Sequence, residues 1–81
     1  MARIIKKKKY NIIGQQVKKA RLEANLSQQQ LSDKLETAAV YICRGSISRI
    51  ESGARTVTDI EIEGLASVLN VSIDFLFGKE Q

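Results

Sequence analysis

The side chains available for chemistry in this 81-residue chain are chiefly cationic: it has 13 lysines and arginines, no histidine and a single cysteine, Cys43. Without imidazole or paired thiols, most metal sites, an internal disulfide and the usual catalytic triads are excluded. The sequence also lacks a glycine-rich phosphate loop and a converging pair of carboxylates. An enzyme is therefore the least favoured class, and we expect no catalytic residue, metal, cofactor or small-molecule ligand.

The positive charge is concentrated in one part of the chain. Residues 1–57 hold twelve basic residues against four acidic ones, a net charge of +8, whereas residues 58–81 have a net charge of −4. The sequence pI is near 9.5. Such a distribution favours a polyanionic partner for the N-terminal part, with the acidic part facing away from it.

The apolar residues are too scattered for a membrane span. The longest apolar run, residues 38–43, has six residues, against the roughly 20 that a helix needs to cross a bilayer. The N-terminus also lacks the apolar stretch of about 7 to 15 residues found in secretory signals. We therefore expect no membrane contact and a cytoplasmic, reducing environment, which suits a lone thiol.

One small all-α domain is expected to position the basic side chains. A chain this short supports a single core, its apolar residues recur with helical spacing, and it has neither a convincing strand nor a proline. We divide it into a basic flexible arm (1–10), a folded domain (11–78) and a short tail (79–81). The predicted helices cover about 12–24, 28–37, 45–52 and 59–69, followed by a turn or two at 73–77.

Residues that commonly cap helices stand at the predicted ends. At the N-termini they are Asn11, Ser27, Ser72 and the pair Thr58 and Glu61, which has the spacing of a capping box; at the C-termini they are Asn25 and Gly53. The first helix has an apolar stripe of Ile13, Val17, Ala20 and Ala24.

The helix predicted at 45–52 is short and polar on one side. Ile47 and Ile50 point inward together, which leaves Ser46, Ser48 and Arg49 facing outward. The major groove of DNA admits one helix whose side chains reach the base edges. Two adjacent helices, the second short and polar outward, are suited to helix-turn-helix DNA binding.

Several motifs recur at characteristic spacing from the second helix to the last. They are Leu26-Ser27-Gln28, Leu31, Leu35, Ile47-Ser48-Arg49-Ile50-Glu51-Ser52-Gly53, Leu65-Ala66, Leu69-Asn70-Val71-Ser72, Ile73-Asp74 and Leu76. Together they resemble the phage-repressor and Cro type of helix-turn-helix protein, often called the XRE family, over about residues 12–77. The resemblance implies a five-helix, lambda-repressor-like fold.

The resemblance also implies which side chains face the bases. Aligned on the motif that ends at Gly53, these positions are Arg44, Gly45, Ser46, Ser48 and Arg49. An arginine can form two hydrogen bonds to guanine, worth about 1 to 3 kcal/mol of discrimination, whereas serines select less strongly. Arg44 and Arg49 have the longest reach, and each is expected to contact either a base or a phosphate.

Further contacts are implied for residues outside this helix. The residue matching Gln28 typically anchors to the DNA backbone; the alternative is an ordinary surface glutamine. Arg55 and Thr56 lie where the family places phosphate contacts, and a solvated surface arginine is the alternative. Glu51 is typical of the family and is expected to be structural, as the partner of an arginine or of a backbone amide.

The connection between the second and third helices departs from the family pattern. Leu35 and Ile47 are twelve residues apart, several more than is usual, so the turn is enlarged. We expect residues 40–42 (Val40, Tyr41 and Ile42) to pack back on the bundle as an apolar plug. Cys43 stands where the family often has a hydroxyl or amide cap. A passive small side chain is the favoured interpretation there, and a redox-sensitive thiol is the alternative.

The basic arm contains the run Lys6, Lys7, Lys8 and Lys9. Clustered lysines gain from counterion release when they follow the DNA backbone or lie in a groove. The alternatives are a solvated tail without a specific role and a nuclear localisation signal, which does not suit a bacterial type of family.

The apolar C-terminal run predicts a homodimer. If Ile73 and Leu76 complete the core, Phe75 or Phe77 projects outward, and we assign these two phenylalanines to a dimer interface. A two-fold contact there would set two recognition helices about one DNA turn apart, roughly 34 Å. Because the interface is small, we expect the dimer to form mainly on DNA.

The main functional hypothesis is a sequence-specific transcriptional regulator that binds double-stranded DNA. We expect a repressor that reads a two-fold symmetric operator with its third helix in the major groove. The alternative is a protein-interaction module of the same fold, such as an antitoxin or a phage or plasmid adaptor.

Overall fold

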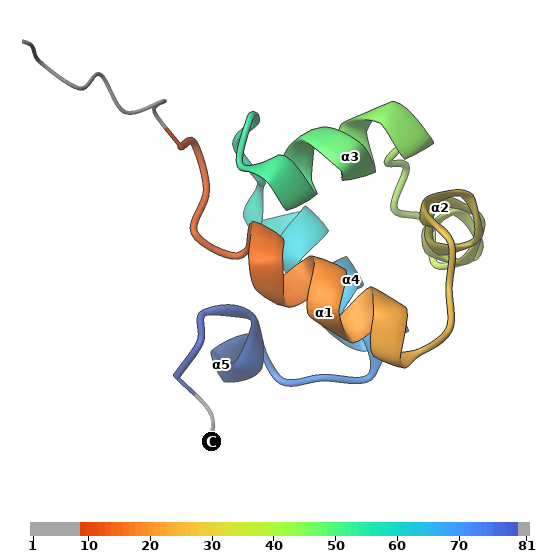
Figure 1. The fold of residues 1–81 in the computed structure, drawn as a ribbon. Helices are drawn as coiled ribbons and strands as arrows, with labels where there is room; N and C mark the ends of the chain where they lie inside the picture. The colour runs from red at the N-terminus through yellow and green to blue at the C-terminus, as the bar shows by residue number, and fades with distance from the viewer. Residues whose placement is uncertain (1–8, 80–81) are drawn as a thin grey trace, which may run out of the picture.

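The computed structural model describes residues 9–79, and this part of the chain folds into five α-helices without a strand (Figure 1). The helices are α1 (Gly14–Glu23), α2 (Gln28–Thr37), α3 (Arg44–Ser52), α4 (Asp59–Leu69) and α5 (Ile73–Leu76). The predicted all-α, five-helix fold is confirmed. None of these helices is long and apolar enough to cross a membrane.

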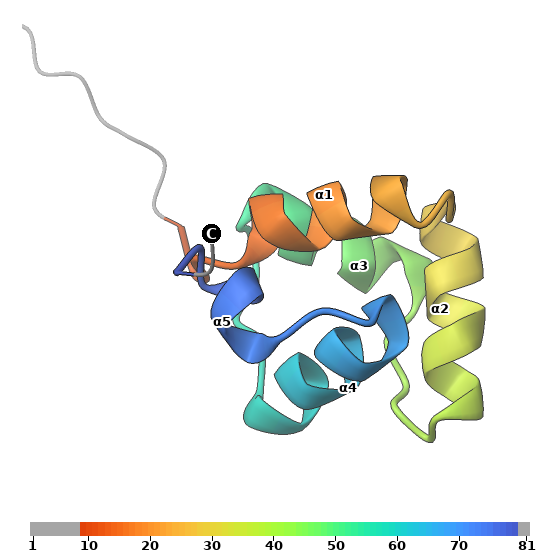
Figure 2. The same ribbon diagram turned by 90° about the horizontal axis from the view of Figure 1, so that it is seen from below.

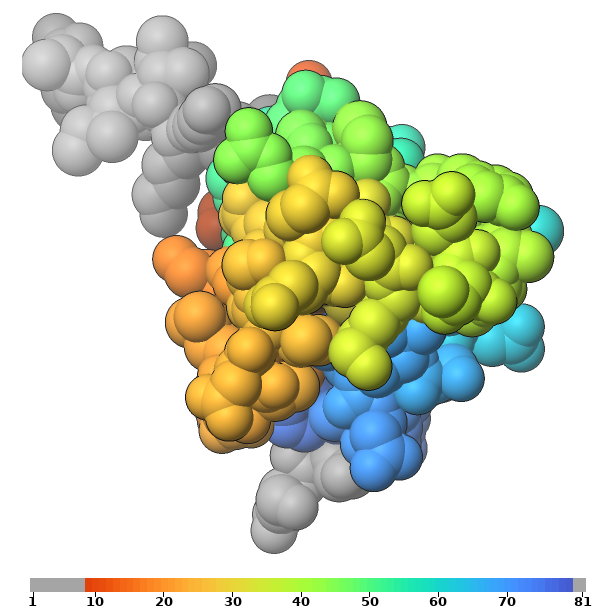
Figure 3. All heavy atoms as spheres, turned by 90° about the vertical axis from the view of Figure 1, so that its right-hand side faces the viewer, coloured from red at the N-terminus to blue at the C-terminus, as the bar shows by residue number. Residues whose placement is uncertain are grey.

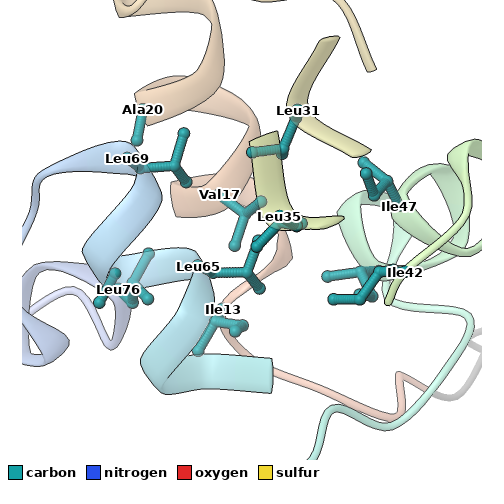
Figure 4. Close-up of a cluster of buried hydrophobic side chains, with 12 residues drawn as sticks. Ile13, Val17, Ala20, Leu31, Leu35, Ile42, Ile47, Leu65, Leu69 and Leu76 are labelled. Carbon is teal, nitrogen blue, oxygen red and sulfur yellow. The ribbon is translucent and has the colours of Figure 1, made fainter. Parts of the chain in front are cut away.

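A single hydrophobic core holds the five helices together. Figure 4 shows Val17 of α1, Leu35 of α2 and Leu65 of α4 pointing toward one another, and all three are fully buried. Fully burying an aliphatic side chain contributes about 1.5 to 3 kcal/mol relative to leaving it exposed. The buried apolar residues are Ile13, Val17, Ala20, Leu31, Leu35, Ile42, Ile47, Ile50, Leu65, Ala66, Leu69 and Leu76.

Side-chain caps set the starts of α2 and α4. The Ser27 hydroxyl accepts a hydrogen bond from Gln30 N–H at 3.0 Å, and Gln30 Oε1 accepts one from Ser27 N–H at 2.8 Å. Thr58 and Glu61 form the same reciprocal box at α4. Both predicted caps are confirmed, and α2 and α4 have the predicted bounds.

The N-terminus of α1 differs from the prediction. Ile13, not Asn11, occupies the N-cap position, and the helix begins at Gly14. Asn11 still contributes, because its Oδ1 accepts hydrogen bonds from the N–H groups of Ile13 and Gly14 at 3.1 and 2.8 Å. It acts from two residues before the N-cap position, and its Nδ2 donates to two carbonyl groups elsewhere in the molecule.

The C-terminal end of α1 also corrects the predicted stripe. The helix ends at Glu23, and Ala24 is exposed because Asn25, at φ 58°, turns the chain away in the left-handed conformation. Leu26 packs partly buried against the core in its place. The buried position on the last turn belongs to Arg21, which is 7% exposed.

The connector between α2 and α3, residues 38–43, follows α2 along one face of the molecule (Figure 3). Ile42 is 3% exposed and Val40 is partly buried, so the predicted apolar plug exists. Tyr41 was assigned to it wrongly, since its side chain is 75% exposed. Neighbouring side chains of an extended segment point to opposite sides, and only alternate ones can face the core.

Candidate nucleic-acid interface

The helix α3, which was predicted to read DNA, has two sharply different faces. Ile47 and Ile50 are buried at 0% and 1% exposure, and they attach the helix to α1 and α2. The outward residues are Arg44, Gly45, Ser48 and Arg49, which are exposed, and Ser46, which is half-buried. α3 lies along one edge of the bundle, with its start beside α2 (Figure 1). All five predicted base-facing positions therefore lie on one helix, one residue longer at its N-terminus than predicted.

Three outward side chains form one row along α3. Arg49 Nη2 donates a hydrogen bond to Ser46 Oγ at 3.2 Å, and Cys43 Sγ lies 3.4 Å from the same oxygen. Residues three apart on a helix are surface neighbours, so this row runs along the helix axis. Hydrogen bonding with Ser46, followed by weaker influences that include the Arg49 charge, lowers the pKa of the Cys43 thiol.

A buried ion pair attaches α3 to α1. Arg21 Nε lies 2.6 Å from Glu51 Oε2, Arg21 Nη2 donates to Glu51 Oε1 at 3.0 Å, and the two side chains are 8% and 5% exposed. Arg21 Nη1 also donates to Leu26 O at 2.8 Å. The hydrogen bond with Glu51 raises the pKa of Arg21. Glu51 is thus structural, as expected, and its partner is an arginine.

Sequence reasoning missed Arg21 because an arginine in an amphipathic helix is normally read as a solvated residue. A signal was present in its position, since Arg21 follows the buried Val17 by one helical turn. A cation on the buried face of one helix implies an anion on the buried face of another, since an unpaired buried charge is very costly.

Gln28, at the start of α2, is held by the same ion pair. Its Nε2 donates to Glu51 Oε1 at 3.1 Å, and the side chain is half-buried. Gln28, Ser48, Glu51 and Ser52 line one shallow hollow together with Lys18. The structure therefore places Gln28 beside the outward side of α3 and fixes the direction of its amide.

Arg55 has a protein partner. Its Nη1 and Nη2 donate to the two carboxylate oxygens of Glu61 at 2.9 and 2.8 Å, and Nη1 also donates to Thr56 O at 2.7 Å. This pair is partly exposed, with 25% of the arginine and 15% of the glutamate side chain accessible. The contact raises the pKa of Arg55 and lowers that of Glu61. Sequence reasoning saw Glu61 only as part of a capping box.

The last lysine of the basic run lies at the C-terminal end of α3. Tyr10 N–H donates to Gly53 O at 2.8 Å, and Lys9, which is exposed, runs over Gly53. Lys6, Lys7 and Lys8 lie outside the described residues. Within the described part of the chain, no group of three metal-ligating side chains occurs.

The helix α5 differs from the predicted arrangement. Leu76 is fully buried, but Ile73, which was expected in the core, is 44% exposed. Phe75 and Phe77 are half-buried and pack against the core rather than projecting freely. Gln16 of α1 helps to hold the turn by donating to Phe75 O at 2.9 Å. Figure 2 shows α5 close to the start of α1. The two phenylalanines flank Leu76, and this leaves Ile73 as the most accessible apolar side chain of α5.

Comparison with known proteins agrees with this geometry. Residues 17–76 match the family model HTH_3, described as helix-turn-helix. Among solved structures, the restriction-modification controller protein C.AhdI from Aeromonas hydrophila is similar, with 28% sequence identity and a TM-score of 0.70. The similarity covers 80% of this chain and 87% of that protein. No curated protein sequence matches the chain.

Proposed function

Because the chain belongs to the XRE family of helix-turn-helix proteins, which are DNA-binding transcription regulators, we propose that it reads a specific double-stranded site with α3 in the major groove. It acts there as a repressor at a two-fold symmetric operator. Occupying a promoter is enough to exclude another protein from it, so repression requires no surface beyond the DNA-binding one. The likeness to a restriction-modification controller protein supports the control of a restriction-modification system as its setting.

The observation that carries the proposal is the division of α3 into a buried and an outward face. Ile47 and Ile50 anchor the helix, and the outward residues carry no apolar side chain that would need covering by protein. Arg44 and Arg49 are both exposed and have side chains long enough to reach guanine O6 and N7. Ser46 and Ser48 add short hydrogen-bonding groups close to the helix axis.

Phosphate contacts are assigned to the residues around α3. Gln28 is held by Glu51 beside α3, and Thr56 is exposed just beyond the C-terminal end of the same helix. Arg55 contacts a phosphate while remaining paired with Glu61, or exchanges Glu61 for the phosphate when DNA is bound. The lysines of the arm add sequence-independent affinity, and the side chain of Lys9 lies against Gly53.

A homodimer on DNA completes the proposal. The accessible part of α5, Ile73 with the exposed edges of Phe75 and Phe77, supplies a small apolar patch for a two-fold contact. A patch of three partly exposed side chains is much smaller than a stable interface, which buries roughly 1,200 Å² or more. The dimer therefore depends on DNA, where each bound half-site raises the local concentration of the second protomer.

Selection of bound duplexes from a random pool tests the function. We expect one enriched sequence with two inverted half-sites centred about one or a few helical turns apart, bound by two protomers. Arg49→Ala should lower the affinity for this site by about 1 to 3 kcal/mol and relax the preference at one position of each half-site.

The matched control is Arg44→Ala, which removes an exposed arginine from the start of the same helix. It should relax the preference at a different position, or lower the affinity for all duplexes equally if Arg44 contacts a phosphate. Unchanged affinity and unchanged base preference in both variants would refute the placement of α3 in the groove. Enrichment of no sequence by the wild-type protein would refute site-specific binding altogether.

A further inference from the structure

Asn11 joins three parts of the molecule through four hydrogen bonds. Its Oδ1 accepts from Ile13 and Gly14 N–H at the start of α1, as described above. Its Nδ2 donates to Ile50 O at 3.0 Å and to Arg55 O at 2.8 Å. One amide group thereby uses both its oxygen and its nitrogen to hold α1, α3 and the loop after α3 at fixed positions.

The residues on either side reinforce this junction. Tyr10 N–H donates to Gly53 O at 2.8 Å. Gly14 packs so closely on α3 that a Cβ there would lie 2.3 Å from Ile50 O, and the chain entering α1 therefore touches the α3 backbone directly. The segment before α1 is thus bound along its length to the C-terminal end of the recognition helix.

Lys9 is the point at which the basic arm leaves the junction. Its Cβ, Cγ and Cδ lie 3.5, 3.3 and 3.2 Å from the position that a Cβ on Gly53 would occupy. Gly53 has a left-handed φ of 79° and is buried, so the lysine stem takes the space that a side chain would fill there. A cation at this place is also favoured by the partial negative charge at the end of a helix.

We propose that Asn11 is a positioning residue for DNA binding, which fixes the exit of the basic arm beside the C-terminal end of α3. This inference rests on the proposed function, in which α3 lies in the groove and the arm lysines contact phosphates. An arm that starts beside α3 starts next to the DNA backbone that borders the same groove. Little additional chain entropy is therefore lost when its lysines reach the phosphates. Without the two bonds from the Asn11 Nδ2, the segment before α1 is held less firmly against α3, and residues 9–12 gain freedom to move.

The size of the effect follows from the free length of the arm. The local concentration of a tethered group falls roughly as the −3/2 power of the tether length, so doubling a short free segment lowers it about threefold. The change should appear only in the contribution of the arm, and the contacts made by α3 itself should be unaltered.

The test is a double-mutant cycle between Asn11 and the arm. Asn11→Asp keeps the acceptor that caps α1 but cannot donate to Ile50 O or Arg55 O. Duplex affinity is measured for the wild type and for Asn11→Asp, each with and without residues 2–8, on the selected site and on an unrelated duplex of equal length. Taking the ratio between the protein with and without the arm in each background removes any effect of the aspartate on contacts other than those of the arm.

Deletion of the arm lowers the affinity of the wild type by a certain factor. We expect this factor to be smaller in Asn11→Asp, by up to about threefold. The same deletion should flatten the salt dependence in the wild type by up to about 0.9 units per lost lysine–phosphate contact, and by less in the variant. Equal factors in the two backgrounds would overturn the proposal. An arm whose deletion changes nothing in the wild type would overturn it as well.

Two further variants separate positioning from general destabilisation. Insertion of four glycines between Lys8 and Lys9 leaves every contact of Asn11 intact but moves the preceding lysines away from α3. It should reduce the factor by which deletion of the arm lowers affinity by a similar amount. Asn70→Ala is the control for general destabilisation, because it strains the left-handed turn after α4, at φ 56°, far from the arm in sequence. In this variant, deletion of the arm should lower affinity by the same factor as in the wild type.

The positioning role of Asn11 would be contradicted if the glycine insertion had no effect. It would also be contradicted if Asn70→Ala reduced the effect of arm deletion as much as Asn11→Asp does. Failure of the proposed function has a different signature. In that case the wild-type protein shows no preference between the selected site and the unrelated duplex, whatever the arm contributes on either of them.

Discussion

The two ends of α3 are built in opposite ways. At its C-terminal end, Ile50 and Glu51 are buried, and the backbone accepts or approaches groups from Asn11 and Gly14. At its N-terminal end, Arg44 and Gly45 are exposed, and the N-cap residue, Cys43, makes no side-chain cap. The C-terminal end is fixed by contacts from the segment before α1, from α1 and from α2, whereas the N-terminal end is exposed to solvent.

This difference separates the residues that stabilise α3 from those to which we assign DNA recognition. Side chains proposed to contact DNA are not buried against protein, so the outward residues contribute little to folding. The fixed end compensates, because a helix held rigidly at one end also directs the side chains at the other. Substitutions should therefore affect folding strongly near Glu51 and weakly near Cys43.

The largest effect is expected for Glu51→Gln. The change removes the charge that balances Arg21 while keeping the shape, so a buried guanidinium loses its counter-ion. Breaking a buried pair in this way costs about 3 to 5 kcal/mol. A small domain has a free energy of unfolding of only about 5 to 15 kcal/mol, so the variant should lose a large part of its stability and unfold at a clearly lower urea concentration than the wild type.

The control for this prediction removes both charges. A double variant, Arg21→Met with Glu51→Leu, leaves no buried charge and should lie within about 2 kcal/mol of the wild type or exceed it in stability. If Glu51→Gln unfolds at the wild-type urea concentration, the ion pair does not fix the C-terminal end of α3, and the contrast between the two ends fails.

A second, more accessible arginine–glutamate pair follows α3 and should contribute less. The Arg55 guanidinium lowers the pKa of Glu61 from its ordinary value of 4.5. A carboxyl whose pKa is lower in the folded state stabilises that state above its ordinary pKa, and the contribution is lost as the pH falls through the folded value. For a pair that is 25% and 15% exposed, we expect about 1 kcal/mol at neutral pH.

The measurement compares the wild type with Glu61→Gln in urea denaturation over a range of pH. The variant keeps an oxygen for the capping box but has no charge. The difference in unfolding free energy should be constant well above pH 4.5 and should shrink below it. A difference that does not change with pH would show that the charge of Glu61 adds nothing to the folded state.

Local features of this fold were predictable from the sequence. The bounds of α2 and α4 follow from capping boxes, Ser27 with Gln30 and Thr58 with Glu61, whose members lie three residues apart. The outward face of α3 follows from two isoleucines at the spacing of one helical turn. In each case the interacting residues lie within one turn, so the sequence order determines the contact.

The contacts that fix α3 could not be predicted in the same way. Arg21 and Glu51 are 30 residues apart, and Asn11 and Ile50 are 39 apart. Such pairs form only when packing of the whole core brings two helices together, and many side chains of suitable type compete for each place. Arg55 illustrates this competition, since a cation assigned to phosphate has Glu61 as its partner in the protein.

The smallest effect is expected at the exposed end of α3, where Cys43→Ser should stabilise the protein. The N-cap residue Cys43 has φ −72° and ψ 162°, and Ser27 and Ser72 have nearly the same angles at the starts of α2 and α5. Those two serines accept a hydrogen bond from the backbone N–H three residues later, whereas the Cys43 side chain makes no such cap. A serine hydroxyl in the same place can accept from Ser46 N–H.

We expect Cys43→Ser to gain about 0.5 to 1 kcal/mol in the free energy of unfolding, and Cys43→Ala, which has no cap, to gain nothing. Duplex affinity should be unchanged in both variants, because neither enlarges the side chain next to Arg44. The gain is small since it concerns one backbone N–H at a solvent-exposed helix end. A loss above 1 kcal/mol in Cys43→Ala would mean that the thiol itself holds the start of α3. The two ends of the helix would then share the stabilisation that the buried ion pair and Asn11 are expected to provide at one end alone.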